Sequence, residues 1–205
     1  MSTEIDQLND RIALAYQSAD PTGIVASAPG LGPVLAAVIL GRLGDPNRFR
    51  DLAAVRSYTG LVPKINQSGT VDRHHGLTKA GDHVLRFALF VAADHARKAD
   101  PTLATRYQRL RDRGKHHNSA LCTLAAVLVT RIAACWRAGE HYQLRNLDGQ
   151  PITAAEGRTL SNRTNTDATA ARQSTNTRTG RRRKESRSAP STGPSTTEPT
   201  TPPAA

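Results

Sequence analysis

The chain has 205 residues, a formal net charge of +11 at pH 7 and 4% aromatic residues. Residues 1–160 carry 20 basic and 14 acidic side chains, and residues 161–205 carry eight basic and three acidic ones, so both parts favour a polyanionic partner. The low aromatic content argues against stacking platforms for single-stranded nucleic acid. Neither a signal peptide nor an apolar run of the roughly 20 residues that a membrane span needs is recognised, so we expect a cytoplasmic protein without membrane contact.

The first predicted element is an amphipathic helix over residues 4–19, which Asp20-Pro21 ends. Its apolar positions recur on one face of the helix and therefore need a partner surface. These positions are Ile5, Leu8, Ile12, Ala15 and Ala19.

The turn Pro29-Gly30-Leu31-Gly32-Pro33 is the most informative local pattern, and an apolar helix that Gly44 ends follows it. Gly30 and Gly32 can adopt positive φ, or can let another backbone come close. The pattern is typical of a helix-hairpin-helix, in which backbone N–H groups of the hairpin meet a nucleic-acid phosphate. An αα-turn that only packs is the alternative, and the basic composition favours the binding motif.

The middle of the chain predicts a third helix over about 48–58, which Gly60 closes. Residues 61–77 lack helical periodicity, so they form a polar loop or a short hairpin. Thr78 or Asp82 then caps a helix that extends to about Lys98.

Two more helices complete the predicted domain. Asp100-Pro101 opens the first of them, which ends near Gly114. The second is the most apolar of the chain, begins at Asn118 or Ser119, and is ended by Gly139.

These elements predict a mainly α protein with three parts. Residues 1–20 are a helix, residues 21–145 are a domain with the helix-hairpin-helix, and residues 146–205 are a basic tail rich in Ser, Thr, Pro and Arg. We predict that this tail is disordered, because it cannot bury enough apolar surface to offset its ordering entropy. Its run Arg181–Lys184 is either a non-specific polyanion contact or a solvated charge run.

No metal site or cofactor is expected in this chain. Cys122 and Cys135, the two cysteines, lie on one predicted helix roughly 20 Å apart, so they cannot pair. No zinc-type Cys or His spacing occurs. The pairs His74-His75 and His116-His117 lie in polar stretches, where adjacent histidines are more often solvated than metal-bound.

Ser68, in Gln67-Ser68-Gly69, is the candidate nucleophile. A serine can attack a phosphodiester when its pKa is lowered and cations hold the phosphate. The basic residues near it in sequence are Lys64, Arg73, Lys79 and Arg86. From these residues alone, a turn serine before a glycine is the more frequent interpretation.

Several motifs occur in an order that resembles one family. They are Ala28-Pro-Gly-Leu-Gly-Pro33, Leu43-Gly-Asp-Pro-Asn-Arg-Phe49, Tyr58-Thr-Gly-Leu-Val-Pro63, Gln67-Ser-Gly69, Leu77-Thr-Lys-Ala-Gly81 and Leu85-Arg86. Residues 22–140 thereby resemble the C-terminal transposase domain of the bridge-RNA-guided insertion-sequence transposases, the "IS one-ten" group.

The resemblance implies a helical domain that binds DNA and a guide RNA and works in a multimer. It also implies that a serine, at the position of Ser68, joins covalently to a DNA 5′-phosphate during strand exchange. Lys79 and Arg86 match basic positions of the family, and we expect Gly30, Gly32, Lys64, Arg73, Lys79 and Arg86 to contact DNA.

Only the helix over residues 4–19 precedes the hairpin, and residues 1–20 thereby resemble a remnant of the helical linker that normally joins the two domains of the family. Full-length members carry an N-terminal RuvC-like domain with four acidic metal ligands, and Mg²⁺ is expected only with that domain. We therefore expect a truncated or split transposase, inactive alone, that works with a full-length relative or as a homo-oligomer. The alternative is a non-enzymatic helix-hairpin-helix protein that binds nucleic acid or regulates a full-length transposase.

Overall fold

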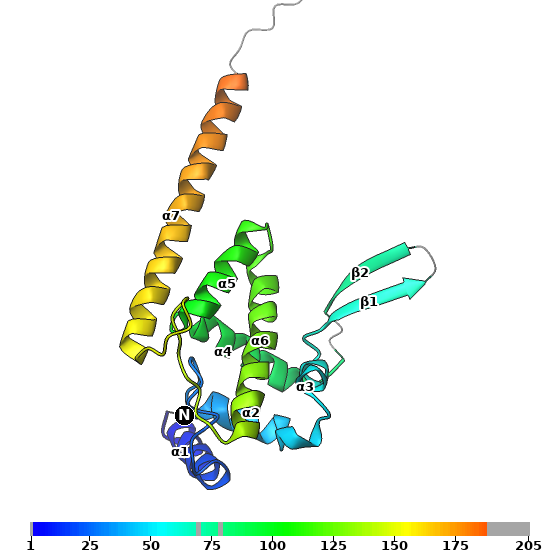
Figure 1. Cartoon of the computed structure of the whole chain (residues 1–205), viewed down its shortest axis with the longest axis vertical. Coiled ribbons are helices and arrows are strands. Elements are labelled where there is room, and N and C mark those ends of the chain that lie inside the picture. The colour runs from blue at the N-terminus through cyan, green and yellow to red at the C-terminus, as the bar shows by residue number, and fades with distance from the viewer. Residues whose placement is uncertain (1, 69–70, 78–79, 188–205) are drawn as a thin grey trace, which may run out of the picture. The chain divides into compact units, whose positions relative to one another are not determined.

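The computed structural model describes the backbone of residues 2–68, 71–77 and 80–187, and the side chains of residues 3–62 and 80–173. It confirms the mainly helical class (Figure 1). The chain divides into two units, residues 1–168 and 169–205. Its elements are α1 (Ser2–Ala19), α2 (Pro33–Leu43), the 3-10 turn η1 (Pro46–Arg48), α3 (Leu52–Thr59), β1 (Pro63–Ser68), β2 (Val71–Leu77), α4 (His83–Ala96), α5 (Pro101–Asp112), α6 (His117–Ala138) and α7 (Ala154–Arg187).

The core of the first unit forms where α4 packs against α6 and α2, with α3 and α5 also packed on α6. Alanines alternate with leucines on the inner face of α4, which lets neighbouring helices approach closely while the leucines fill the space. The largest fully buried side chains of α4 and α6 are Leu85, Leu89, Leu121, Leu124, Leu128, Val129 and Ile132.

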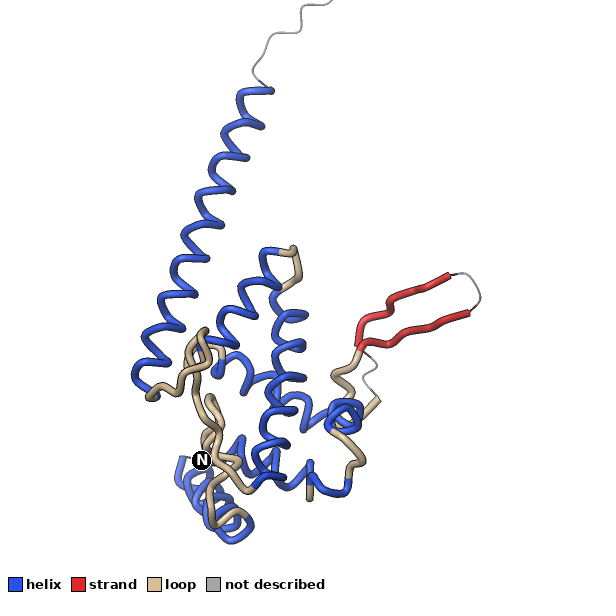
Figure 2. Tube along the Cα trace, viewed as in Figure 1, coloured by secondary structure: helices blue, strands red, loops and turns tan. Residues whose placement is uncertain are grey.

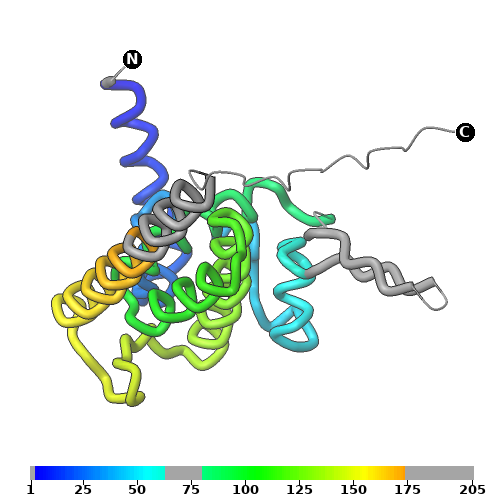
Figure 3. The backbone as a smooth tube through the Cα atoms, turned by 90° about the horizontal axis from the view of Figure 1, so that it is seen from above, coloured from blue at the N-terminus to red at the C-terminus, as the bar shows by residue number. Residues whose placement is uncertain are grey.

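The predicted N-terminal helix is present as α1, but its apolar face is only partly covered. α1 packs on α2, and its end is fixed by Tyr16, whose hydroxyl donates to the buried Asp20 at 2.6 Å. At the other end of the helix, Ile5 and Leu8 are 55% and 54% exposed. Figure 3 shows this first part of the helix running out from the helical core.

Strands β1 and β2 pair antiparallel, with Ser68 opposite Val71 at the turn (Figure 2). This is the short hairpin that was one of the two alternatives for residues 61–77. The pairing is irregular at its open end, between Pro63 and Lys64.

The expected disorder after residue 146 is wrong for residues 154–187, which form α7. The helix starts with a capping box, in which Thr153 Oγ1 accepts from Glu156 N at 3.3 Å and the Glu156 carboxylate accepts from Thr153 N at 2.8 Å. Gly157 then lies so close to the Ala99 carbonyl that a Cβ there would be 2.5 Å from its oxygen. The cap and this packing stabilise the start of α7. Residues 188–205 lie outside the described residues.

Helix α6 is the one helix, within the described part of the chain, that is long and apolar enough to cross a membrane by length and composition. No apolar run of that length was expected from the sequence, so this helix was missed as a candidate by length and composition. In the fold, α6 contributes eight buried residues to the contact with its neighbours, as a core helix does.

Candidate nucleic-acid interface

The hairpin β1–β2 carries the candidate nucleophile. Ser68 is the last residue of β1, Lys64 lies on the same strand, and Arg73 lies on β2 opposite Asn66. The backbone register therefore places Ser68 at the turn end of the hairpin, and Lys64 and Arg73 nearer its base. Lys79 lies outside the described residues, and the structure describes no side chain between residues 63 and 79.

Two glycines bring the ends of this hairpin together. Gly60 has a φ of +68° and closes α3 by donating its N–H to the Ser57 carbonyl at 3.0 Å. Gly81 lies against the same end of α3: a Cβ on it would be 2.9 Å from Gly60 N and would collide with the Tyr58 carbonyl oxygen. We name this contact the Gly60–Gly81 clamp, and it requires that residue 81 has no side chain.

Charged side chains surround the Gly60–Gly81 clamp. Asp82 caps α4 by accepting from Val84 N at 2.9 Å and Leu85 N at 3.0 Å. It also pairs with Arg42 at 3.2 Å. The hydrogen bond from Leu85 N lowers the pKa of Asp82, and the charge of Arg42 also lowers it. Asp82 therefore stays ionised and fixes the start of α4 directly after the clamp.

Arg86 is half-buried beside the clamp rather than freely exposed. Its Nη1 donates to the Thr59 carbonyl at 3.4 Å, and a Cβ on Gly60 would be 2.8 Å from that nitrogen. The guanidinium thus compensates the negative end of the α3 dipole. A DNA contact of Arg86 stays a prediction. In such a contact the guanidinium would have to bind DNA and the Thr59 carbonyl at the same time.

The motif at residues 43–49 packs against α3, the helix that ends at the Gly60–Gly81 clamp. Asp45 caps η1 by accepting from Asn47 N at 2.8 Å, and the Arg48 guanidinium donates to the Leu43 carbonyl. That guanidinium also lies 4.2 Å from the ring centre of Phe49 and 4.6 Å from that of Tyr58. The motif therefore ties the end of α2 to α3, which leads into the hairpin.

The two glycines of the turn at residues 29–33 have different environments. Gly30 has a φ of +81°, and a Cβ there would be 2.5 Å from Ala96 N and 2.7 Å from Ala92 O, both on α4. Gly32 precedes α2 with a φ of −83° and a ψ of 172°, and no described atom lies within 4 Å of its Cβ position. Positive φ and close approach are therefore confirmed for Gly30, and positive φ is wrong for Gly32.

The described residues do not fit a metal ion. They contain no group of three His, Cys, Asp or Glu side chains that could bind one. Cys122 and Cys135 both lie on α6 and are free, and burial raises the pKa of each thiol. Of the histidines considered earlier, His117 shares a 2.7 Å hydrogen bond with the Tyr107 hydroxyl, and the side chains of His74 and His75 are not described.

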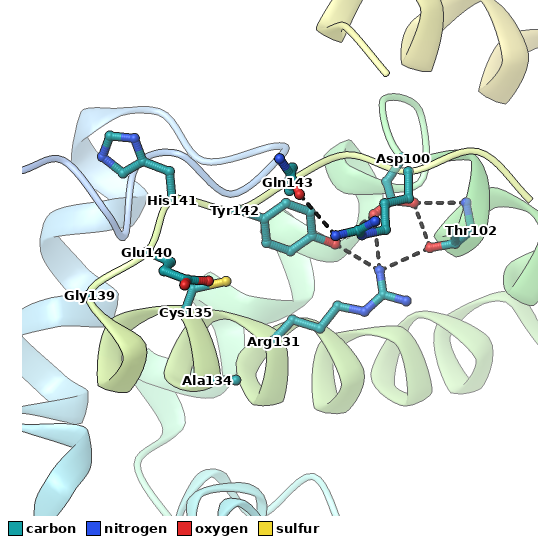
Figure 4. Close-up of a pocket in the computed structure, with 11 residues that line it drawn as sticks. Asp100, Thr102, Arg131, Ala134, Cys135, Gly139, Glu140, His141, Tyr142 and Gln143 are labelled. Atoms are coloured by element: carbon teal, nitrogen blue, oxygen red, sulfur yellow. Dashed lines mark hydrogen bonds and ion pairs between the residues drawn. The ribbon is translucent and has the colours of Figure 1, made fainter. Parts of the chain in front are cut away.

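Sequence reasoning missed a pocket of about 870 Å³ beside the end of α6 (Figure 4). The buried Asp100 carboxylate there accepts from the Tyr142 hydroxyl at 2.6 Å and from Arg131 Nη1 at 3.0 Å. Arg131 Nη1 also donates to Thr102 Oγ1 at 2.9 Å. Burial, and then the charge of Asp100, raises the pKa of Tyr142.

This network joins the segment after α6 to the start of α5. Each charged group in it already has a partner of opposite charge, so its evident role is structural. The sequence signal that could have found it is Asp100-Pro101-Thr102, which was interpreted only as the start of a helix.

Comparison with known proteins identifies the same part of the chain. Residues 23–108 match the family described as Transposase IS116/IS110/IS902 family. This segment runs from the turn before α2 to α5 and contains the whole β-hairpin and the Gly60–Gly81 clamp.

Individual relatives agree with the family match. The insertion element IS110 43.6 kDa protein of Streptomyces coelicolor is 36% identical over 131 residues, which are 64% of this chain and 32% of that protein. The insertion element IS116 44.8 kDa protein of Streptomyces clavuligerus is 30% identical over 118 residues, 57% of this chain and 30% of the relative. The pilin gene-inverting protein of Moraxella bovis is 32% identical over 71 residues, 34% of this chain and 22% of the relative.

The matched region spans about a third of the length of the first two relatives. The family match covers the segment in which the motifs were found in order. Over residues 23–108 the chain is therefore similar to the Transposase IS116/IS110/IS902 family, and the named insertion-element proteins are similar to it as well.

Proposed function

We propose that this chain is the DNA-binding domain of an insertion-sequence transposase and that Ser68 is the nucleophile of its strand exchange. One observation carries the proposal. The family-matched segment contains a hairpin with Ser68 at its turn end, and two glycine-containing motifs of that segment meet in the Gly60–Gly81 clamp at its base. A clamped hairpin can present a serine to a ligand while the helical core holds its ends.

The proposed step is a transesterification on a DNA phosphodiester. Ser68 Oγ loses its proton to a base and bonds to the phosphorus, and the bond from phosphorus to the 3′ oxygen breaks. The DNA 5′-phosphate is then attached to the serine, and the other strand end leaves as a 3′-hydroxyl that takes up a proton. Cations near the phosphate would stabilise the charge that develops, and Lys64, Arg73 and Lys79 are the proposed donors.

DNA binding is proposed to involve the turn at residues 29–33 as well as the hairpin. We interpret this turn and α2 as the second half of a helix-hairpin-helix. The N-terminus of α2 has no side-chain cap, and the space around Gly32 is open among the described residues. Backbone N–H groups at such a helix start are suited to a phosphate. Gly30 instead supports the motif by packing on α4.

The proposed partners are DNA, a guide RNA, and either further copies of the chain or a full-length transposase. By resemblance, Mg²⁺ belongs to a RuvC-like domain of the family. Since the described residues contain no group of side chains for a metal, we derive no step of this chain through one. By the same resemblance, we propose that the reaction needs the RuvC-like domain, on whichever chain it lies.

Trapping of a covalent protein–DNA species tests this proposal. The full chain is incubated with target DNA, guide RNA and a RuvC-like domain from a relative, and adducts are separated on denaturing gels. We expect an adduct that Ser68→Ala abolishes and that Ser57→Ala, a change of an exposed serine on α3, leaves intact.

Two results would contradict the proposal. An adduct that survives Ser68→Ala would exclude Ser68 as the nucleophile. DNA binding without any adduct, in the presence of the complete set of partners, would favour the non-enzymatic binding protein.

A further inference from the structure

The turn between α5 and α6 carries the densest cluster of positive charge among the described side chains. Between Pro101 and Gly139 the sequence has seven basic residues and one acidic residue, Asp112. Five of the seven lie within ten residues at this turn, which is visible between α5 and α6 in Figure 2. We name these five the basic tip: Arg106, Arg109, Arg111, Arg113 and Lys115.

Three other arginines of the first unit have structural partners. Arg131 pairs with Asp100, and Arg137 donates to the carbonyls of Pro46 and Phe49 with distances down to 2.5 Å. Arg97 pairs with Asp94 at 2.7 Å. Arg97 also lies 4.5 Å from the ring centre of Tyr107 on α5. Each of these three guanidinium groups therefore contacts a second segment of the fold.

The basic tip lacks this kind of partner. The exposed side chains of Arg109 and Arg113 make no hydrogen bond or ion pair within the part of the chain that the structure describes. Arg111 Nη1 donates to the Lys115 carbonyl at 2.7 Å, and Lys115 Nζ lies 3.5 Å from Thr123 Oγ1. These two contacts hold cations at the tip without neutralising them.

One residue of the tip, Arg111, makes a smaller contribution than burial does to the pKa of the neighbouring His117. Burial lowers the pKa of His117, and the charges of Arg97, Arg111 and His116 lower it further, against an opposing effect of Asp94. Compensation of the α5 dipole accounts for cations in its last turn. It does not account for Lys115, which follows Gly114 outside the helix.

We infer that the basic tip binds the phosphate backbone of duplex nucleic acid. The inference rests on the proposed function, since it assumes that the chain binds nucleic acid, and it adds a contact surface that neither the hairpin nor the turn at residues 29–33 contains. Arg109 lies in the last turn of α5 and Arg113 directly follows the helix as its C-cap. Four residues span about 6 Å at the rise of a helix, and one strand of a duplex carries a phosphate every ~3.4 Å of its axis. Tyr107, the one aromatic residue of this segment besides histidine, is buried, so contacts to the backbone rather than base stacking fit the surface.

The test measures the affinity of the full chain for duplex DNA and for duplex RNA against salt concentration. Each phosphate contact contributes about 0.9 to the slope of log K against log salt on DNA. We expect the double variant Arg109→Gln/Arg113→Gln to lower this slope by about 2. A loss on DNA alone or on RNA alone identifies which duplex the tip binds.

The matched control is Arg11→Gln/Arg158→Gln, which removes the same charge from exposed helical positions on α1 and α7. We expect its slope to stay close to that of the unmodified chain. An equal slope in the two double variants would overturn the inference while leaving the proposed function intact. An unmodified chain that binds neither duplex would overturn the proposed function itself. Equal thermal midpoints of the variants show that folding is not the cause.

Discussion

The turn at residues 29–33 and the Gly60–Gly81 clamp both depend on glycine, but in different ways. In the turn, Gly30 contacts the backbone of α4 with a φ of +81°, and Gly32 lies in open space with an ordinary φ of −83°. In the clamp, two glycines 21 residues apart face each other and hold the ends of a hairpin. The comparison teaches that a glycine motif combines packing positions and open positions, and that only the open ones are available to a ligand.

Among the substitutions that test this comparison, Gly30→Ala is expected to lower the free energy of unfolding most. The new Cβ would lie 2.5 Å and 2.7 Å from backbone atoms of α4, which cannot move away as a flexible side chain could. Together with the positive φ, we expect a loss of about 3 kcal/mol in the free energy of unfolding. Denaturant titration measures it.

Gly23→Ala is the matched control, because Gly23 has a φ of +66° and no described atom within 4 Å of its Cβ position. It isolates the backbone strain, for which we expect about 1 kcal/mol. Equal losses in the two variants would mean that contact with α4 does not require Gly30.

Gly81→Ala is expected to cause the next largest loss in the free energy of unfolding. Its Cβ would collide with the Tyr58 carbonyl and press on Gly60, so the clamp would have to open, at a cost of about 2 kcal/mol. Gly41→Ala is the control of opposite sign: it lies in α2 with open space around it, and alanine is the better helix former by roughly 0.8 kcal/mol. A Gly81→Ala chain as stable as the unmodified chain would contradict the clamp.

The sequence predicted most helix ends correctly because these ends depend on local chemistry. The third helix is an exception at its start: it begins at Leu52, after the cap Asp51, and not at about residue 48. Gly44, Gly60 and Gly139 end helices with positive φ as expected, and Asp82 caps α4. The start of α7 also had a local signal, the capping box Thr153-x-x-Glu156, which was overlooked because the composition of the tail suggested disorder.

The candidate site was less accessible to sequence reasoning, because its geometry depends on contacts between distant residues. Nothing in the local sequence indicates that Gly81 meets Gly60, or that Arg86 donates to Thr59. The different roles of Gly30 and Gly32 likewise depend on where α4 passes. Ser68 was singled out through resemblance to a family, and its position at the end of β1 agrees with that hypothesis without testing it.

A pH titration distinguishes how the two regions are fixed in place. Burial would raise the pKa of Asp20, but hydrogen bonds from Tyr16 and Val25 lower it overall. A lowered pKa stabilises the fold above the ordinary carboxyl pKa of about 4, and this contribution is lost as the pH falls through the folded-state pKa. We therefore expect Asp20→Asn to lower the unfolding free energy by about 1–2 kcal/mol at pH 7, and by progressively less as the pH falls below about 4.

Asp82→Asn provides the comparison for that titration. Asp82 is more exposed than Asp20, and asparagine caps helices about as well as aspartate. We therefore expect Asp82→Asn to cause a smaller loss in unfolding free energy, and this loss should depend less on pH. A pH-independent loss in Asp20→Asn would show that its charge does not stabilise the segment before the turn at residues 29–33.

Gly32→Val is expected to change stability least and to be the most informative about function. A φ of −83° with a ψ of 172° is extended backbone that valine adopts readily, and no described atom lies within 4 Å of the Cβ position. We therefore expect the free energy of unfolding to change by less than about 0.5 kcal/mol.

If a phosphate approaches the start of α2, the two methyl groups of the valine in Gly32→Val occupy part of its path, and DNA affinity should fall by about tenfold, or ~1.4 kcal/mol. Gly32→Ala, with one carbon in place of three, should give an intermediate loss. Normal affinity in both folded variants would mean that this turn serves packing alone, through Gly30, and that DNA contacts must be sought at the hairpin and the basic tip.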